Sequence, residues 1–324
     1  MVKVGLIGVG YLGKIHLKIL LETPAYEFVG IYDIDKSTSD TMSKQYNVKA
    51  YTSGEELMED CEALIIVTPS NTHYEIASSA IKKGKHVFLE KPITPTIEEA
   101  KLLTLLEKEA GVKIQVGHVE RFNPAFIAAK PFINKPQYIE IHRLAKYNPR
   151  GTDVSVTLDL MIHDLDLLLK IVGSSIKNIY AFGTKTISST VDMVNTRIEF
   201  ENGCIANLTA NRMAFSNMRQ IKVYQADSIV NINLLDKVTE VIRIKNADKN
   251  SQNLVVKSGT KLPDKELVFE HPIILPTNAI KEELLAFHNS ITTGSKPVVT
   301  IEDAIGVLSF AYSIDEKIQH LISK

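Results

Sequence analysis

The first third of the chain alternates between two hydrophobic periods. Short, largely apolar runs that suit strands buried on both faces lie at Val2–Ile7, Glu27–Tyr32, Ala63–Val67, His86–Leu89 and Lys113–Val116. Between them, helical patterns span Gly13–Glu22, Ser37–Tyr46, Gly54–Met58, Thr72–Lys83 and Thr96–Ala110. We expect Ser37 and Thr96 to be N-caps, Thr96 with Glu99 in a capping box. This alternation predicts a doubly wound parallel sheet of the Rossmann type.

The pattern changes near Gly117 to segments of alternating polarity, at Gln137–Arg143, Val194–Phe200, Cys204–Ala210, Gln220–Gln225 and Ser228–Asn233. Asn202-Gly203 predicts a hairpin, and helices are expected at about Leu158–Val172, Asn278–Thr292 and Ile301–Leu321. These elements predict an α+β domain with a large, mostly antiparallel open sheet. We therefore divide the chain into a Rossmann-type domain, residues 1–118, and an α+β domain, residues 119–324.

Composition narrows the class of protein. The chain has 324 residues and a net charge of −1, from 37 basic and 38 acidic side chains. This balance argues against nucleic-acid or anionic-membrane partners held by bulk electrostatics. Two cysteines, Cys61 and Cys204, are too few for a disulfide framework, and no clustered ligand set predicts a metal. With no membrane-spanning run and no cleavable signal, we expect a cytoplasmic protein.

A glycine loop follows the first predicted strand and opens a helix, as Gly8-Val9-Gly10-Tyr11-Leu12-Gly13. Gly8 permits a tight turn, Gly10 lets the backbone approach a pyrophosphate, and Gly13 lets helix and strand pack closely. Asp33 ends the second strand twenty residues later, where a carboxylate binds a ribose 2′-hydroxyl. A 2′-phosphate would be repelled there, so NAD is favoured over NADP. The alternative is a purely structural turn with a loop aspartate.

Two further strand ends carry candidate residues. Thr68-Pro69-Ser70-Asn71, followed by His73, suits a cofactor contact or an ordinary helix cap. Glu90-Lys91-Pro92 places an ammonium at another strand end, where it could bind a substrate hydroxyl and stabilise developing negative charge. The alternative for Lys91 is a solvated surface lysine. Whether the Lys91–Pro92 bond is cis is not readable from sequence.

The predicted helix over Leu158–Val172 is apolar except for a narrow polar stripe, formed by Asp159, His163, Asp166 and Lys170. Such a stripe predicts a buried helix whose polar line faces a cavity or partner groups. If it faces a cavity, His163 is the natural general base, and Asp159 orients its imidazole or binds a substrate hydroxyl. A thin wet edge on a buried helix is the alternative.

Taken together, these motifs resemble the Gfo/Idh/MocA oxidoreductase family. The resemblance rests on the glycine loop with His16, Thr68-Pro69 with His73, and His86 to Pro92, then on Arg121-Phe122-Asn123-Pro124 and Asp159-Leu160-Met161-Ile162-His163-Asp164. It implies that Lys91, Asp159 and His163 act at the substrate, and that NAD or NADP, with Glu90 and Lys91 among its contacts, lies at the glycine loop. It also implies that residues 1–118 bind the dinucleotide, and that residues 119–324 bind the substrate and form homodimers or homotetramers through the open sheet. Met161-Ile162 departs from the glycine that many members carry there.

The stretch Gly117-His118-Val119-Glu120-Arg121-Phe122-Asn123-Pro124 is similar to a subgroup that includes dehydrogenases acting on UDP-N-acetylglucosamine-type nucleotide sugars. Arg121 and Asn123 are therefore candidate substrate-binding residues. Cations near them in sequence would suit a diphosphate, namely Arg143, Lys146 and Arg150. Each could equally be a surface charge.

We expect an NAD-dependent dehydrogenase that transfers a hydride between a sugar secondary alcohol, in a nucleotide sugar, and nicotinamide. Lys91, Asp159 and His163 are its candidate catalytic residues. Two alternatives stay open: a free polyol or hexose dehydrogenase of the same family, and a non-catalytic dinucleotide sensor.

Overall fold

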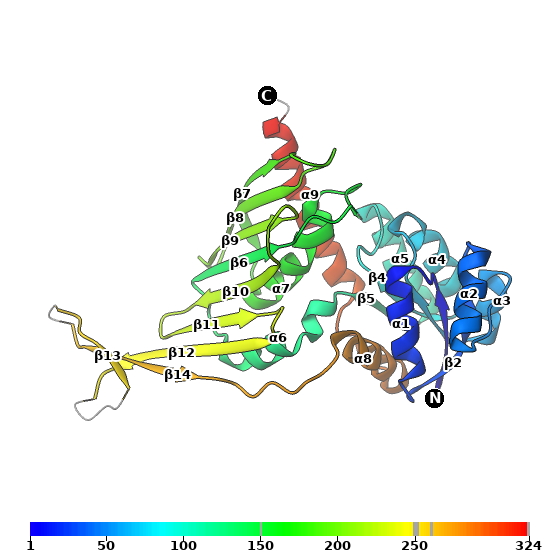
Figure 1. Cartoon of the computed structure of the whole chain (residues 1–324), viewed down its shortest axis with the longest axis horizontal. Coiled ribbons are helices and arrows are strands. Elements are labelled where there is room, and N and C mark those ends of the chain that lie inside the picture. The colour runs from blue at the N-terminus through cyan, green and yellow to red at the C-terminus, as the bar shows by residue number, and fades with distance from the viewer. Residues whose placement is uncertain (150, 249–252, 260–261, 323–324) are drawn as a thin grey trace. The chain divides into compact units, whose positions relative to one another are not determined.

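The computed structural model describes residues 1–149, 151–248, 253–259 and 262–322. The chain divides into two compact units, which Figure 1 draws in one view. The first consists of residues 1–119 and 278–309, and the second of residues 120–277 and 310–324. The expected division lies close to the first of these boundaries. It was wrong for residues 278–309, which belong to the first unit.

The first unit holds a five-stranded parallel sheet in the order β2-β1-β3-β4-β5. Its strands are β1 (Val2–Ile7), β2 (Tyr26–Tyr32), β3 (Ala63–Ile66), β4 (His86–Glu90) and β5 (Ile114–Gly117). Its helices are α1 (Tyr11–Leu21), α2 (Lys36–Tyr46), α3 (Gly54–Asp60), η1 (Ser70–Thr72), α4 (His73–Lys82), α5 (Ile97–Ala110) and α8 (Ala279–Thr293). The predicted Rossmann-type sheet is confirmed, because apolar runs buried on both faces form parallel strands.

The helix ends follow local sequence in most cases. Thr96 caps α5 by accepting a hydrogen bond from the backbone N–H of Glu99 at 3.2 Å, as expected. The expected cap at Ser37 was wrong, since Asp35 caps α2 and accepts the N–H of Ser37 at 3.0 Å. An aspartate two residues earlier offers a charged acceptor and begins the helix sooner.

Helix α8 returns from the far end of the chain to complete the core of the first unit. Leu284 and Phe287 are fully buried in one cluster with Leu17 of α1 and Phe88 of β4. The ring of Phe287 meets that of Phe88 edge to face at 6.1 Å between centroids. Burying two such side chains contributes several kcal/mol, about 1.5–3 kcal/mol each, which explains why this segment joins the first unit.

The second unit is built on a nine-stranded sheet in the order β13-β14-β12-β11-β10-β6-β9-β8-β7. Among the described strands of this second sheet, only β6 and β9 pair in parallel. The strands are β6 (Tyr138–Leu144), β7 (Ile176–Thr184), β8 (Met193–Phe200), β9 (Ile205–Asn211), β10 (Met218–Tyr224), β11 (Ser228–Asn233), β12 (Val238–Asn246), β13 (Leu254–Val256) and β14 (Lys265–Glu270). The predicted α+β domain with a mostly antiparallel sheet is confirmed.

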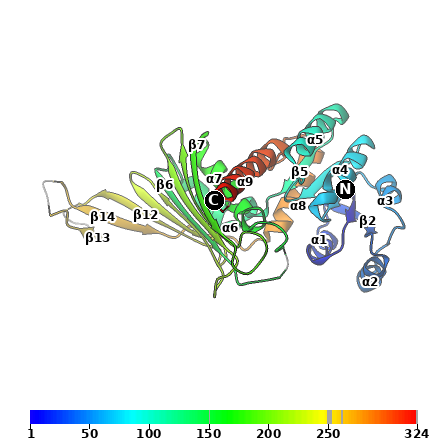
Figure 2. The same cartoon turned by 90° about the horizontal axis from the view of Figure 1, so that it is seen from above.

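Helices cover one face of this sheet, where Figure 2 shows α6 (Pro124–Ala129) and α7 (Ile162–Val172). The remaining turns are η2 (Val119–Phe122), η3 (Lys130–Phe132) and the π-helical η4 (Thr157–Met161), and α9 (Ile301–Ile322) passes from the first unit into the second at residue 310. Side chains alternate between buried and partly exposed along β6, β9 and β11. On edge strand β7, Tyr180 and Phe182 are more than half exposed. The sheet therefore has one face in the core and one open face.

Candidate active site

A cavity of about 640 Å³ lies at the carboxyl ends of β1, β2 and β3. Strand β1 sits between β2 and β3, so the chain reverses its direction of winding at this point, where open α/β sheets bind their ligands. Six residues expected at the cofactor line this cavity, namely Gly8, Gly10, Asp33, Thr68, Pro69 and Asn71. The structure therefore brings together residues from three separate motifs.

The glycine loop has the geometry that a diphosphate needs. Gly8 has φ +90°, and a Cβ there would lie 2.5 Å from the carbonyl oxygen of Val67. A Cβ on Gly13 would lie 2.0 Å from the Gly8 carbonyl oxygen, whereas one on Gly10 would meet nothing within 4 Å. No side chain caps the start of α1, and its first turn holds no acidic residue. Its N–H groups and dipole therefore remain available to an anion.

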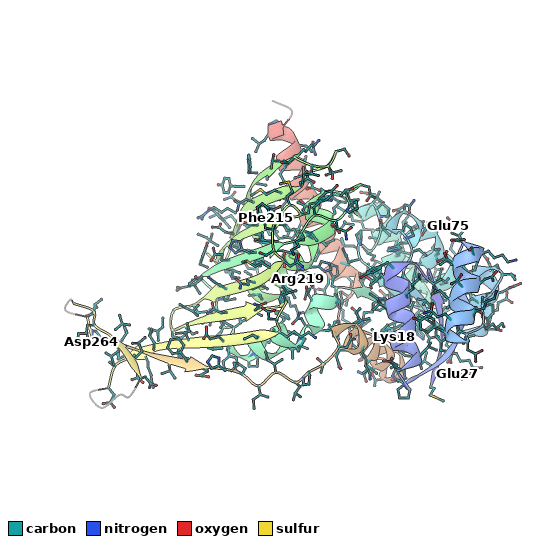
Figure 3. All side chains as sticks on the ribbon, viewed as in Figure 1. Lys18, Glu27, Glu75, Phe215, Arg219 and Asp264 are labelled. Atoms are coloured by element: carbon teal, nitrogen blue, oxygen red, sulfur yellow. The ribbon has the colours of Figure 1, made fainter. Side chains whose placement is uncertain are left out.

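The carboxylate of Asp33 is fixed beside this loop. Its Oδ2 accepts the backbone N–H of Val9 at 2.7 Å, and its Oδ1 accepts that of Asp35 at 2.9 Å. Glu55 and Glu75 line the same cavity, and no lysine or arginine does so among the described lining residues. Figure 3 marks Glu75 on α4. Sequence reasoning missed these two glutamates, because single exposed acids on helices carry no motif.

These residues fit a dinucleotide. The loop offers open backbone at Gly10, α1 offers uncapped N–H groups, and Asp33 offers a fixed acceptor at the end of β2. Three acidic side chains along the cavity oppose an additional phosphate on the ribose.

His73 does not line this cavity, although it was expected among the cofactor contacts. Its imidazole is buried, with Nδ1 at 3.0 Å from the Pro92 carbonyl oxygen and Nε2 at 2.9 Å from that of Thr68. Burial lowers the pKa of His73, against the opposing effect of these carbonyls. The side chain thus ties the loop after β3 to the loop after β4.

Lys91 follows β4 in that second loop, and its side chain is half-buried. The Lys91–Pro92 peptide bond is cis. Glu90 was expected to contact the cofactor, yet its side chain is turned into the interior. Its Oε1 lies 2.9 Å from Nε2 of His16, and its Oε2 accepts the backbone N–H of Lys91 at 3.2 Å.

Asp159 and His163 lie in the second unit, at the junction of η4 and α7. The single helix expected over Leu158–Val172 is instead a π-helical turn followed by an α-helix, and such turns are frequent at functional sites. Both side chains are half-buried. A Cβ on Gly151 would lie 3.3 Å from both carboxylate oxygens of Asp159, so the loop packs directly against this carboxylate.

Buried Arg212 holds that loop. Its guanidinium donates to the carbonyl oxygens of Gly151 at 2.8 Å, Val154 at 2.6 Å and Val191 at 2.9 Å. Sequence analysis did not single out Arg212, because an arginine at the end of a strand has no distinctive pattern.

The polar stripe was expected to face a cavity or partner groups, and at Asp166 it faces a partner group. Asp166 is fully buried and binds Arg121, while Lys170 is exposed. Asp164, on another face of α7, is also buried and binds Nε and Nη2 of Arg143. Burial raises the pKa of Asp164, while the guanidinium of Arg143 opposes that shift. The helix is therefore anchored by two buried ion pairs.

Two of the residues expected near a substrate, Arg143 and Asn123, have structural contacts. Arg143 is buried and binds both Asp164 and Glu120, so its expected availability to a phosphate was wrong. Asn123 is buried, donates to Glu120 at 2.9 Å and caps α6. Lys146 is exposed, and Arg150 lies outside the described residues. Substrate contact by Arg121 and Asn123 stays a prediction.

A half-exposed arginine completes this network. Arg219 on β10 lies opposite Arg143 of β6 in the strand register. Its Nη1 lies 3.3 Å from Oε1 of Glu120. Its side chain is 47% exposed, and Figure 3 labels it near the middle of the sheet. Burial and the neighbouring charge of Arg143 lower the pKa of Arg219. Sequence reasoning missed it.

Comparison with known families decides the class. The family described as "Oxidoreductase family, NAD-binding Rossmann fold" matches residues 2–118, and the GFO/IDH/MocA C-terminal domain matches residues 135–227. This chain belongs to the Gfo/Idh/MocA family. It is a dehydrogenase that acts on CH–OH groups with a nicotinamide dinucleotide, and the resemblance seen in the sequence is confirmed.

Individual relatives show how far the likeness extends. UDP-N-acetylglucosamine 3-dehydrogenase of Acidithiobacillus ferrooxidans is 30% identical over 240 residues, which cover 74% of this chain and 76% of that protein. A crystal form of the same enzyme superposes with a TM-score of 0.90 at 26% identity, covering 100% of this chain and 99% of that one. Scyllo-inositol 2-dehydrogenase (NAD(+)) of Bacillus subtilis is 27% identical over 323 residues, 94% of this chain and 90% of that protein.

No helix within the described part of the chain is long and apolar enough to cross a membrane.

Proposed function

We propose that this chain is an NAD-dependent dehydrogenase for a secondary alcohol of a nucleotide sugar, of the UDP-N-acetylhexosamine class. The observation that carries the cofactor part is the fixed carboxylate of Asp33 in a cavity lined by Glu55 and Glu75. A ribose diol can donate to this carboxylate, whereas a 2′-phosphate would meet three negative charges. The nucleotide-sugar part is supported by the 30% identity to a UDP-N-acetylglucosamine 3-dehydrogenase.

In this proposal three side chains act on one substrate hydroxyl. His163 accepts the hydroxyl proton, Lys91 donates a hydrogen bond to the same oxygen, and Asp159 orients the imidazole or the sugar. NAD, when bound, accepts the hydride from the carbinol carbon. Glu90 and His73 hold the loop that carries Lys91, and Arg212 holds the loop that packs on Asp159.

A free polyol is the second candidate substrate. A scyllo-inositol 2-dehydrogenase shares 27% identity over 94% of this chain, a longer match than that of the nucleotide-sugar enzyme. The buried ion pairs of Arg143 also remove one cation that sequence analysis assigned to a diphosphate, and Arg121 and Asn123 likewise have buried contacts within the protein. A non-catalytic sensor is not supported, because the relatives are named dehydrogenases.

Substrate screening tests the proposal. Purified protein with NAD is offered UDP-N-acetylglucosamine, UDP-N-acetylgalactosamine, scyllo-inositol and myo-inositol, and NADH formation is followed by absorbance. We expect turnover with a UDP-sugar at a kcat/KM at least about tenfold above that for any inositol. A higher kcat/KM for an inositol than for either UDP-sugar would instead establish a free polyol as the substrate.

Two variants test the catalytic assignment. Lys91→Ala and His163→Ala should each lower kcat by about 100- to 10,000-fold, with NADH binding retained. Lys82→Ala and His320→Ala, at exposed positions, are matched controls and should keep normal activity. Normal turnover in either active-site variant would contradict the assigned roles.

A further inference from the structure

Three ionisable side chains meet in the interior of the first unit, apart from the dinucleotide cavity. They are His16 on α1, Glu90 at the end of β4 and Glu283 on α8. One nitrogen or oxygen atom from each lies within 4.8 Å of the others. His16 and Glu283 have no exposed surface, and Glu90 is 7% exposed.

The contacts of Glu90 define one half of this cluster. Its Oε1 accepts from His16 Nε2 at 2.9 Å, and its Oε2 accepts the backbone N–H of Lys91 at 3.2 Å. Gly117 pairs with Glu90 across β4 and β5, and a Cβ there would lie 3.0 Å from the carboxylate. The absence of a side chain at Gly117 therefore makes room for this carboxylate.

Glu283 forms the other half. Its backbone carbonyl accepts a hydrogen bond from Nε2 of Gln115 at 2.7 Å, which fixes this turn of α8. Neither oxygen of its carboxyl group has a hydrogen-bond partner among the described residues. Burial, and then the charge of Glu90, raise the pKa of Glu283 well above its ordinary value. Two adjacent buried carboxylates would not both remain ionised.

Counting donors and acceptors shows what the cluster requires. The groups that face Glu283 from other elements are Glu90, His16 and the amide of Gln115. Nδ1 of His16 and Oε1 of Gln115 are, like the Glu283 oxygens, buried without a hydrogen-bond partner among the described residues. Acceptors exceed donors, and one more proton reduces this imbalance. Because His16 Nε2 donates to Glu90, this nitrogen offers no lone pair to a metal ion in the present arrangement.

We propose that Glu283 is a positioning residue, a neutral carboxylic acid that donates its proton to the Glu90 carboxylate and thereby fixes the backbone of Lys91. The proton stays on Glu283, and Glu90 keeps its negative charge between three donors. His16 supplies the second donor and the Lys91 N–H the third. This role rests on the proposed function of Lys91 at the substrate.

Substitutions at Glu283 separate a proton donor from a packing residue. Glu283→Gln keeps an N–H donor of similar shape and should keep kcat within about twofold of the parent enzyme. Glu283→Leu keeps volume without a donor, and its kcat should fall at least about tenfold through displacement of Lys91, with the Kd for NADH unchanged. Glu282→Gln, the half-exposed neighbour, is the matched control. Equal losses in the Gln and Leu variants, or full activity in both, would overturn the proposal.

The pH dependence of stability tests the proton without reference to Lys91. A carboxyl group whose pKa is raised in the folded protein lowers the free energy of unfolding as pH rises. The loss begins above the pKa of the unfolded chain, about 4.3, and grows until the pH passes the pKa of the folded protein. Glu283→Gln cannot ionise, so its Tm relative to the parent should rise as pH increases. A Tm difference that does not change with pH would contradict a shared proton on Glu283. If Lys91→Ala is fully active while this pH dependence holds, the proposed function fails and the buried acid stands.

A metal assay distinguishes a proton from a bound cation in this cluster. Purified parent enzyme should contain no stoichiometric metal by mass spectrometry, and EDTA should leave its Tm unchanged. A bound metal that is absent from Glu283→Gln would show that a cation, not a proton, occupies the cluster.

Discussion

Arg121 and Asp166 form a two-pronged ion pair in the interior of the second unit. Nε of Arg121 donates to Oδ2 of Asp166 at 2.8 Å, and Nη2 donates to Oδ1 at 2.6 Å. The two side chains are only 3% and 0% exposed. This pair ties η2 to α7, the helix that carries His163. A residue that the sequence marked for substrate thus supports the position of a candidate catalytic residue.

Breaking this pair from one side should destabilise the protein. Arg121→Met leaves the Asp166 charge buried without its partner, which costs about 3–5 kcal/mol. The double variant Arg121→Met/Asp166→Leu removes both charges and should recover most of that loss. Urea unfolding of the full chain, followed by fluorescence or circular dichroism, measures the free energy of unfolding of the single and the double variant.

The same double variant also tests substrate contact by Arg121. If the arginine is only structural, KM for the substrate stays at the parent value once stability is recovered. A KM increase of tenfold or more in the double variant would support the contact with substrate that the sequence suggested.

Two glycines of the loop should respond differently to an added methyl group. Gly10→Ala meets nothing within 4 Å at a φ of −63°, so its Tm should match that of the parent, while NADH binding weakens at least about tenfold. Gly13→Ala drives a Cβ against the Gly8 carbonyl oxygen and should cost about 1–3 kcal/mol or more. Thermal unfolding and NADH titration distinguish them, and tight NADH binding by Gly10→Ala would contradict its role.

Asp33 should decide between the two dinucleotides. Asp33→Ala removes a charged acceptor worth about 1.5–3 kcal/mol, so KM for NAD should rise about tenfold or more. KM for NADP should fall, because one of three negative charges along the cavity is lost. Asp35→Ala removes only the α2 cap, and its NAD-to-NADP preference should remain that of the parent. An unchanged preference in Asp33→Ala would reject this assignment.

Asp192 should make stability sensitive to acid. Its Oδ2 accepts the backbone N–H groups of Thr186, Ile187 and Ser188, at 2.8, 2.7 and 3.0 Å. Although burial opposes it, these bonds and that from the Ser188 hydroxyl lower the pKa of Asp192. The stabilisation is therefore complete above the unfolded pKa, about 3.9, and is lost as pH falls toward the lower folded pKa.

Replacing this carboxylate with an amide measures that contribution. Asp192→Asn should lose about 1.5–3 kcal/mol at neutral pH, and the difference from the parent should shrink below about pH 4. Denaturant unfolding across pH gives both values. A difference that stays constant between neutral and acid pH would show that the charge of Asp192 has no part in it.

Local pattern was sufficient for much of this protein. The apolar runs predicted β1 to the residue, with the other four strands of the first sheet placed within one residue at each end, because strands buried on both faces need continuous apolar sequence. The glycine spacing and the strand end predicted that Gly8, Gly10 and Asp33 line one cavity, since backbone freedom and the end of a parallel strand are local properties. Asn202-Gly203 predicted its turn for the same reason, and Gly203 has φ +85°.

The sequence pattern did not predict several strands at and near the two edges of the second sheet. Strands β7, β12, β13 and β14 were not expected, and β13 carries three exposed residues with no alternation. Pairing with a neighbour, not burial pattern, makes such segments strands.

Charge pairing was decided by tertiary structure alone. The sequence shows Arg121, Arg143, Asp164 and Asp166 as charges, but only the fold tells which are buried against one another, because ion pairs form between residues 21 to 45 positions apart. Glu283 joins Glu90 across most of the chain, through a helix that returns to the first unit. Sequence thus specified most of the elements and the cofactor loop. Long-range packing decided which polar groups are buried in ion pairs and which remain accessible to a cofactor or substrate.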